Sequence, residues 1–233
     1  MRNGILTLMT TAVCVVASGC AGPTGERGFV RLFNGEDLTG WVTRGEDNAW
    51  MVEDGVLTVK RDVMDGREHN FDYLWTEDMY GDFILDLEFK VIEGTNSGIF
   101  FRTSDLKDPV YTGLEVQVCN SYGRGNRNRK GTAGAIYDCL KPTKNAINKP
   151  GEWNHCVLTC EGSNVKVELN GEQVIDMDLD RWTEAGWNPA GSESERAKNK
   201  FPRAIKDFAR VGYIGLQDHG RPVWYRNVRV KRL

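Results

Sequence analysis

The chain has 233 residues, with 30 Lys and Arg against 33 Asp and Glu, and a formal net charge of −3. This length suits one large β domain or two small ones. The basic run at residues 124–130 is interleaved with Gly and Asn, and no basic stripe stands out. The composition therefore excludes nucleic-acid binding, which depends on clustered Lys and Arg.

The first 20 residues are typical of an export signal. Arg2 provides the positive flank, and the apolar stretch at residues 5–17 is too short to cross a membrane as a mature helix. Ala-Ser-Gly-Cys at residues 17–20 resembles the lipobox of bacterial lipoproteins. We expect export to the periplasm or cell envelope with a lipid on Cys20; ordinary signal cleavage nearby is the alternative.

A tether at residues 21–28 is followed by short apolar segments that turn signals separate. Asp54-Gly55 and Asn170-Gly171 predict tight hairpins, because these residues tolerate positive φ. The best helix candidate, residues 204–208, is short. The pattern favours one all-β domain at residues 29–233, a sandwich of two antiparallel sheets. The expected strands are residues 50–52, 56–59, 83–90, 99–103, 114–118, 153–161, 165–169, 173–175, 210–216 and 223–231.

Three segments, residues 83–90, 114–118 and 213–220, alternate apolar with polar residues. Alternate side chains of a strand point to opposite faces, so each segment presents one apolar face and one face with polar groups. If the three strands share a sheet, the polar groups form one floor. The members of that floor are Glu88, Glu115, Gln117, Gln217 and His219.

His219 has the best chemical context of the three histidines. It lies at a strand end between Asp218 and Gly220, whereas His155 lies within an expected strand and His69 within an acidic loop. An imidazole that titrates near neutral pH can act as acid, base or metal ligand. A histidine with a purely structural role, its ring nitrogens satisfied by hydrogen bonds, is the alternative interpretation.

Glu115 and Gln117 supply only one carboxylate, since an amide does not ionise. A retaining glycosidase needs two carboxylates at close range, and Glu88 can be the second only if its strand is a neighbour. By alternation Arg102 faces opposite Phe101 and can bind a substrate oxygen. An ion pair between Arg102 and Glu115 or Glu88 is the structural alternative.

Residues 182–208 interrupt the strand rhythm with a polar and charged insertion. Insertions of this length are usually functional loops or lids, or are mobile. Trp182 and Trp187 make this one a candidate wall for a sugar site; the alternative is that one or both anchor the loop to the body.

Four cysteines lie beyond the export signal: Cys119, Cys139, Cys156 and Cys160. Cys156 and Cys160 are four residues apart in an expected strand, about 13 Å at ~3.3 Å per residue, which is too far for a mutual disulfide. A bond between Cys119 and Cys139 and buried free thiols both remain open.

An ordered set of short motifs resembles the 3-keto-disaccharide hydrolase family over nearly all of residues 29–233. The motifs are Phe33-Asn34-Gly35, Leu38-Thr39-Gly40-Trp41, Asn96-Ser97-Gly98-Ile99-Phe100-Phe101-Arg102, Glu115-Val116-Gln117, Gly134-Ala135-Ile136-Tyr137, Gly151-Glu152-Trp153-Asn154, Asn170-Gly171 and Gly215-Leu216-Gln217-Asp218-His219-Gly220. The resemblance implies a concanavalin A-like jelly-roll sandwich. Its implied substrates are oligosaccharides or other glycosides that carry a ketone at C-3 of the sugar ring.

Such a substrate needs one base and a stabiliser for the enolate oxygen, rather than two carboxylates. The expected base is His219 or Glu115, with Arg102 as the stabiliser. A divalent metal ion held by Asp218, Glu88 and His219 can replace Arg102 in that role. The expected substrate contacts are Glu88, Gln117, Tyr137, Gln217, Asp218 and Trp187.

The chain departs from the family pattern at one position. The family commonly has Asp soon after Glu-x-Gln, where this chain has Cys119-Asn120. If that Asp takes part in catalysis or metal binding, this chain lacks it. A laminarinase-type glycosidase and a non-catalytic carbohydrate-binding module are the rival interpretations.

Overall fold

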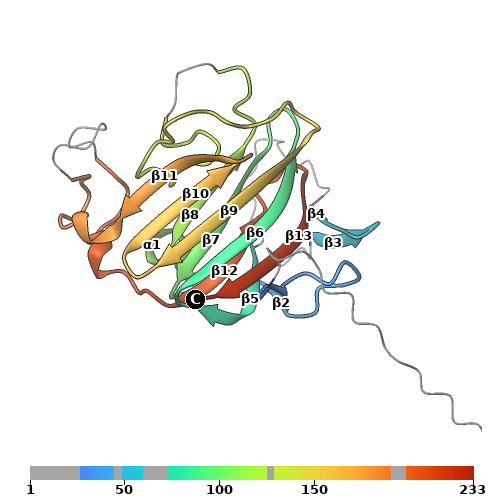
Figure 1. Ribbon diagram of the computed structural model, residues 1–233, viewed down its shortest axis with the longest axis horizontal. Helices are drawn as coiled ribbons and strands as arrows, with labels where there is room; N and C mark the ends of the chain where they lie inside the picture. Colours follow the sequence, from blue (N-terminus) through green and yellow to red (C-terminus); the bar gives the residue numbers. More distant parts are fainter. Residues whose placement is uncertain (1–26, 45–48, 60–72, 125–128, 190–197) are drawn as a thin grey trace, which may run out of the picture.

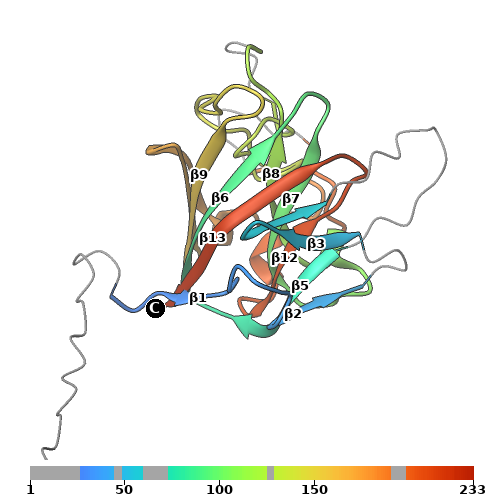
Figure 2. The same cartoon turned by 90° about the vertical axis from the view of Figure 1, so that its right-hand side faces the viewer.

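Two antiparallel sheets face each other in the computed structural model, which describes residues 27–44, 49–59, 73–124, 129–189 and 198–233 (Figures 1 and 2). The larger sheet has eight strands in the order β11-β10-β9-β6-β13-β4-β3, with β1 paired to β13. The smaller sheet has five strands in the order β2-β5-β12-β7-β8. The predicted all-β sandwich is confirmed. The export signal with Cys20 lies outside the described residues.

The strands of the larger sheet are β1 (Val30–Arg31), β3 (Trp50–Glu53), β4 (Val56–Val59), β6 (Phe83–Val91), β9 (Trp153–Glu161), β10 (Asn164–Leu169), β11 (Glu172–Asp178) and β13 (Val223–Arg232). Those of the smaller sheet are β2 (Trp41–Thr43), β5 (Tyr73–Tyr80), β7 (Asn96–Thr103), β8 (Leu114–Cys119) and β12 (Gly212–Gln217). Described helices are single turns: α1 (Pro109–Thr112), η1 (Leu179–Arg181) and η2 (Ile205–Asp207).

The core lies between the sheets and is built from the alternation of the strands. In β6 every second residue, from Phe83 to Val91, is buried, and the residues between them are half-buried. The inward residues of β8 and β12, including Val116 and Leu216, join the same cluster. Burial of each such side chain contributes roughly 1.5–3 kcal/mol, so this cluster determines which face of every strand turns inward.

Both predicted hairpins form at the expected turns. Asp54 and Gly55 join β3 to β4 with φ of 50° and 75°, and Asn170 and Gly171 join β10 to β11 with φ of 53° and 79°. Two successive residues with positive φ are the requirement of a tight turn whose twist matches that of the flanking strands.

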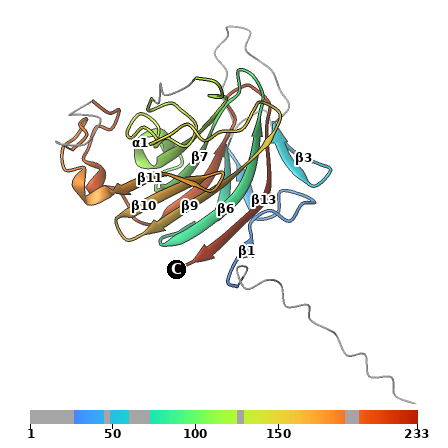
Figure 3. The same cartoon turned by 45° about the horizontal axis from the view of Figure 1, so that its top comes forward.

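The segment after β11 projects beside the edge of the larger sheet, where it is drawn in orange (Figure 3). It contains η1 and η2, the latter within the predicted helix at residues 204–208. Residues 190–197 of the expected lid lie outside the described part of the chain. None of the described helices is long and apolar enough to cross a membrane.

The four described cysteines are free and buried: Cys119, Cys139, Cys156 and Cys160. Burial raises the pKa of Cys139, Cys156 and Cys160 to about 12. The interpretation as buried thiols is therefore confirmed, and the alternative disulfide between Cys119 and Cys139 is absent.

Candidate active site

The outer face of the five-stranded sheet carries a first row of side chains that strand register places side by side. Gly215 of β12 pairs with Trp75 of β5 and with Phe100 of β7, and Phe100 pairs with Glu115 of β8. Trp75 and Phe100 are buried, yet neither belongs to the cluster between the sheets. The row therefore faces away from the core and brings a carboxyl group beside aromatic rings.

A second row lies two residues further along each strand. Gln217 of β12 pairs with Tyr73 of β5, and Gln117 of β8 pairs with Gly98 of β7. Residues two apart in a strand share a face. Register thus places Glu115, Gln117 and Gln217 on one face, as alternation predicts.

Gly98 makes room for the side chain of Glu115. A Cβ atom on Gly98 would lie 2.2 Å from Oε1 of Glu115, far inside van der Waals contact. The carboxyl group consequently lies over the glycine backbone, between the two rows.

Glu115 is almost closed off from water, with 5% of the residue exposed. Its nearest ion pair is weak: Nζ of Lys200 lies 4.0 Å from Oε2. Burial raises the pKa of Glu115 to about 7, and the charge of Lys200 opposes the rise. A carboxyl group with this pKa exchanges protons near neutrality, as general acid–base catalysis requires.

Lys200 reaches the carboxyl group from the segment before η2. Its Nζ lies 4.6 Å from the ring centroid of Tyr137 and 5.4 Å from that of Phe201, so two aromatic faces hold the ammonium group. Burial lowers the pKa of Lys200, while Glu115 raises it. The site therefore contains a partly buried cation directly beside its acid.

Tyr73 connects the second row to the carboxyl group. Its ring stacks on Trp75 at 5.5 Å and meets Phe100 edge-on at 5.3 Å. Its hydroxyl accepts a hydrogen bond of 3.3 Å from Nε2 of Gln217. Burial raises the pKa of the Tyr73 hydroxyl, and the charges of Glu115 and Asp218 raise it further although the Gln217 bond lowers it. The hydroxyl thus stays protonated and able to donate.

Gln117 is held by backbone and side-chain acceptors. Its Nε2 donates to Oδ1 of Asn96 at 2.7 Å and to the carbonyl of Ser97 at 3.3 Å. These bonds fix the amide plane, so its carbonyl oxygen keeps one direction on the outer face.

Asp218 and His219 form the turn that follows β12. Oδ1 of Asp218 accepts a hydrogen bond from the amide of Gly220 at 2.8 Å, and Gly220 has φ of 80°. His219 stands at the centre of this turn and is half-buried. Asp218 is fully buried, and its charge raises the pKa of the Tyr73 hydroxyl, less strongly than burial does.

The two candidate aromatic contacts outside the sheet are both exposed. Tyr137 is 39% exposed under Lys200, and Trp187 is 37% exposed with Nζ of Lys198 5.5 Å from its ring. Trp182, in contrast, is buried and donates to Oδ1 of Asn188 at 3.4 Å. Trp182 therefore anchors the segment to the body.

Glu88 does not join this face, and the expectation of one shared floor is wrong for it. β6 belongs to the eight-stranded sheet, whereas β8 and β12 belong to the five-stranded sheet. Glu88 accepts hydrogen bonds of 3.0 Å from Nε and from a terminal nitrogen of Arg226, and one from Asn227. These donors lower its pKa, Arg226 most strongly.

Arg102 is also placed differently from the expectation. The pairing of β12 with β7 shifts between Tyr213 and Gly215, and Arg102 has φ of 50° at this β-bulge. A bulge breaks the alternation of side chains. The guanidinium is 2% exposed and donates to Asp82 at 2.9 Å and to the carbonyls of Gly81 and Gly162. Its ion pair is structural, with a partner that differs from the two expected ones.

A metal ion held by Asp218, Glu88 and His219 is not compatible with this fold, because Glu88 lies on the other sheet. In the part of the chain that the structure describes, no group of three His, Cys, Asp or Glu side chains is close enough to hold a metal ion.

The model of the 3-keto-alpha-glucoside-1,2-lyase-like domain matches residues 28–231 of this chain. The chain belongs to that family. Among curated proteins, a 3-keto-disaccharide hydrolase of Bacteroides thetaiotaomicron is 28% identical over 240 residues, which cover 91% of this chain and 80% of the relative.

Two solved structures share the fold of this chain. A Parabacteroides distasonis protein, provisionally described as a glycosyl hydrolase, is 33% identical with a TM-score of 0.72, covering 88% of this chain and 99% of its own. A Bacillus subtilis protein of unknown function with a galectin-like fold is 16% identical with a TM-score of 0.52, covering 88% of this chain and 94% of its own. The latter likeness concerns the fold alone.

Two residues of the candidate site, Tyr73 and Lys200, are not identified by sequence reasoning alone. β5, which carries Tyr73, has three consecutive buried residues followed by three exposed ones in place of alternation, so periodicity gives no strand signal. Its aromatic content, Tyr73-Leu74-Trp75, is the one available cue. Lys200 follows a polar and charged stretch of sequence, and its residue type alone does not distinguish it from the charged residues there.

Proposed function

We propose that this protein cleaves glycosides whose sugar ring carries a ketone at C-3. The description of the family names a 3-keto-glucoside lyase, and the Bacteroides relative is named a 3-keto-disaccharide hydrolase. The observation that carries the proposal is the setting of Glu115: a buried carboxyl group with a pKa of about 7 beside Lys200 and the Tyr73 hydroxyl.

The proposed reaction begins with proton transfer at C-2. The C-3 ketone acidifies this proton, and the Glu115 carboxylate removes it, so the electrons of the C–H bond form an enolate with the C-3 oxygen. The enolate then expels the oxygen at C-1, which leaves with a proton as the free alcohol or sugar. The ring retains a C-1 to C-2 double bond, and addition of water across it gives the free 3-keto sugar.

Lys200 and Tyr73 supply the stabilisation that the enolate oxygen requires. An ammonium ion and a protonated hydroxyl, both partly buried, lower the free energy of a developing negative charge more than they would in water. Lys200 thus takes the role that the sequence indicates for Arg102. Since Glu115 is 5% exposed, the side chain of Lys200 has to shift when a substrate contacts the carboxylate.

His219 is the second candidate for the base. It is half-buried in the turn after β12, next to Asp218. Glu115→Gln and His219→Ala, measured on one substrate, separate the two assignments: the base is the residue whose loss removes the proton transfer at C-2, detected as exchange of the C-2 hydrogen with deuterated water.

The test of the proposed function is incubation of the purified protein with a matched pair of glucosides, one oxidised at C-3 and one unoxidised. We expect release of the aglycone from the oxidised glucoside only. The ultraviolet absorbance of the unsaturated ketone tells elimination from complete hydrolysis. Equal activity on both members of the pair indicates a conventional glycosidase, and binding without release indicates a carbohydrate-binding module. Either result contradicts the proposal.

The same incubation with and without a chelator tests the expected divalent metal. A loss of turnover that added metal restores assigns the enolate stabilisation partly to the ion. Unchanged turnover in the presence of the chelator assigns the stabilisation of the enolate to the side chains of the protein.

We also propose export with lipid attachment at Cys20. The residue lies outside the described part of the chain, and the proposal depends on the lipobox-like sequence alone. Cys20→Ser is expected to release the protein from membranes in cell fractionation. Retention of the variant in the membrane fraction would refute lipidation.

A further inference from the structure

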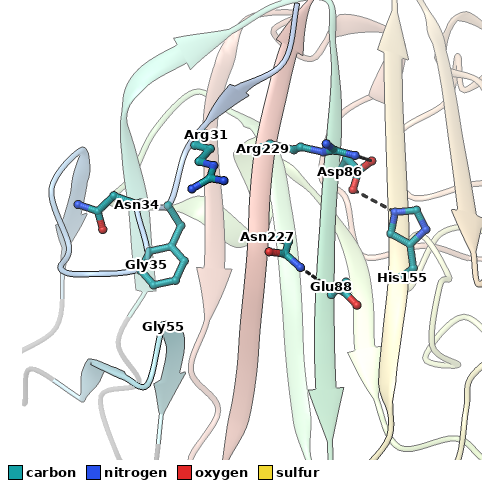
Figure 4. Close-up of a pocket in the computed structure, with 10 residues that line it drawn as sticks. Arg31, Asn34, Gly35, Gly55, Asp86, Glu88, His155, Asn227 and Arg229 are labelled. Atoms are coloured by element: carbon teal, nitrogen blue, oxygen red, sulfur yellow. Dashed lines mark hydrogen bonds and ion pairs between the residues drawn. The ribbon is translucent and has the colours of Figure 1, made fainter. Parts of the chain in front are cut away.

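A polar groove lies on the outer face of the eight-stranded sheet, away from the candidate active site (Figure 4). Its cavity volume is about 540 Å³, within the range of pockets that hold small molecules. It is lined by Arg31, Phe33, Asn34, Gly35, Gly55, Asp86, Glu88, His155, Asn227 and Arg229. Two sequence motifs without a role in the active site meet here: Phe33-Asn34-Gly35 and the segment Trp-Tyr-Arg-Asn-Val at residues 224–228.

A β-bulge directs the polar side chains of β13 into the groove. β13 pairs Arg226 with Glu88 and Arg229 with Asp86, so two residues of β13 stand opposite one residue of β6. Asn227 at the bulge has φ of 53°, a conformation that non-glycine residues seldom adopt. Bulges re-aim side chains beside functional sites. Here the bulge presents three polar residues in close succession outward, where an unbroken strand would turn one inward.

One side of the groove carries an excess of positive charge. Arg31 of β1 pairs directly with Arg229 of β13. Like charges at opposite positions of neighbouring strands are destabilising. Arg229 is compensated by Asp86 at 3.2 Å, whereas no carboxylate of the described residues pairs with Arg31. The guanidinium of Arg31 therefore remains available for a ligand carboxylate.

The other side of the groove carries hydroxyl-binding groups. Nε2 of His155 lies 3.0 Å from Oδ1 of Asp86, and Asn227 donates to Glu88 (Figure 4). Each carboxylate oxygen can accept more than one hydrogen bond, and the Asn227 carbonyl adds a further acceptor. Such planar acceptors and donors are the groups that fix the orientation of a polar ligand.

We propose that the polar groove binds an acidic saccharide, with the carboxylate of a uronic acid on Arg31 and the ring hydroxyls on Asp86, Glu88 and Asn227. A metal cation would meet two guanidinium groups, and a phosphate dianion would meet two carboxylates. A sugar ring with a single carboxylate matches both sides of the groove: its negative charge suits the guanidinium side, and its hydroxyls suit the side with the carboxylates and the amide. The groove contains none of the residues that act in the proposed function. An experiment can therefore refute saccharide binding in the groove without refuting the proposed function, and the reverse.

The test is an NMR titration of the ¹⁵N-labelled protein with three probes: methyl glucuronoside, methyl glucoside and acetate. The glucuronoside is expected to shift amide signals of β6 and β13 and to bind roughly tenfold more tightly than the glucoside, because a charge-assisted bidentate bond is about twice as strong as a neutral one. Acetate, which has the charge without the hydroxyls, is expected to give no saturable shift. The Glu115→Gln variant is expected to bind the glucuronoside as the wild type does.

Arg31→Gln is expected to weaken glucuronoside binding about tenfold and to leave glucoside binding unchanged. Arg232→Gln is the matched control, since Arg232 lies outside the groove on β13, the strand that pairs with β1, and forms an ion pair with Asp78. Asn227→Gly keeps the positive φ without strain and is expected to weaken both saccharides.

Three results would overturn the proposal. They are glucuronoside binding that Arg31→Gln does not alter, saturable acetate binding of equal strength, and absence of any saturable shift on β6 and β13. Turnover of a 3-keto-glucoside by Arg31→Gln at the wild-type rate is expected in every case and shows that the variant folds.

Discussion

Glu115 and Glu88 both lie on the outer face of their sheet, one on the five-stranded and one on the eight-stranded sheet, and have opposite chemistry. Burial closes Glu115 off from water and raises its pKa to about 7, against the opposing charge of Lys200 at 4.0 Å. Glu88 is half-buried, accepts three hydrogen bonds from Arg226 and Asn227, and has a lowered pKa. The surroundings of a carboxyl group, rather than the residue type, decide whether it exchanges protons at neutral pH.

The largest expected difference between the two is in catalysis. Glu115→Gln should reduce turnover of a 3-keto-glucoside by roughly 10²–10⁴-fold, the usual contribution of a general base. Glu88→Gln is the matched control and should stay within a few-fold of the wild type. Steady-state kinetics with the oxidised glucoside checks the pair. Equal losses of turnover in both variants would show that the two carboxyl groups do not differ in catalysis.

Lys200→Met is expected to lower turnover and to move its pH dependence. The charge of Lys200 lowers the pKa of Glu115, so its loss should raise that pKa above about 7 and shift the rising limb of the rate profile to higher pH. Lys198→Met is the neighbouring control, because Lys198 contacts Trp187. A profile that stays in place would show that Lys200 does not act on Glu115.

The pH dependence of stability should differ between wild type and Glu115→Gln. The folded pKa of about 7 exceeds the ordinary value of 4.5, so the folded state keeps a proton that the unfolded state releases. Between these two values the free energy of unfolding should fall with rising pH, by about 3 kcal/mol in total. Urea unfolding at pH 5 and pH 8 measures this term, and Glu115→Gln should lack it. A variant with the same slope as the wild type would contradict the raised pKa.

Gly98→Ala is expected to displace the carboxyl group without unfolding the sheet. The added Cβ would meet Oε1 of Glu115 at 2.2 Å, and crowding of this kind costs about 1–3 kcal/mol of stability. Activity should fall with it. Gly131→Ala is the control, since its Cβ would lie 3.7 Å from the ring of Tyr137, an ordinary contact. Thermal unfolding and the pH–rate profile together separate a displaced acid from a general loss of fold.

The fold was accessible from the sequence because alternation and turn chemistry act locally. β9 has the predicted bounds, and both Gly-containing hairpins lie where expected. Alternation, however, identifies a face of a strand and not the sheet that contains it, so it groups Glu88 with Glu115 although their strands belong to different sheets. The bulge at Arg102 inserts one residue into the strand and so reverses the direction of the Arg102 side chain. No pattern of residues in the sequence predicts this bulge. Lys200 reaches the site through tertiary packing of a loop, which sequence spacing does not encode.

The buried thiols of the core make residues 21–233, expressed without the export signal and its two cysteines, a convenient host for a single chemical reporter. Cys139, Cys156 and Cys160 are buried with pKa values of about 12, so their reactive thiolate forms are almost absent at neutral pH. Cys119 is likewise buried, with its Sγ directed at the carbonyl of Gly131. A cysteine introduced at the exposed Trp187 would therefore take up a maleimide fluorophore ahead of these four, and its emission would follow the segment that carries Lys200 while a sugar binds.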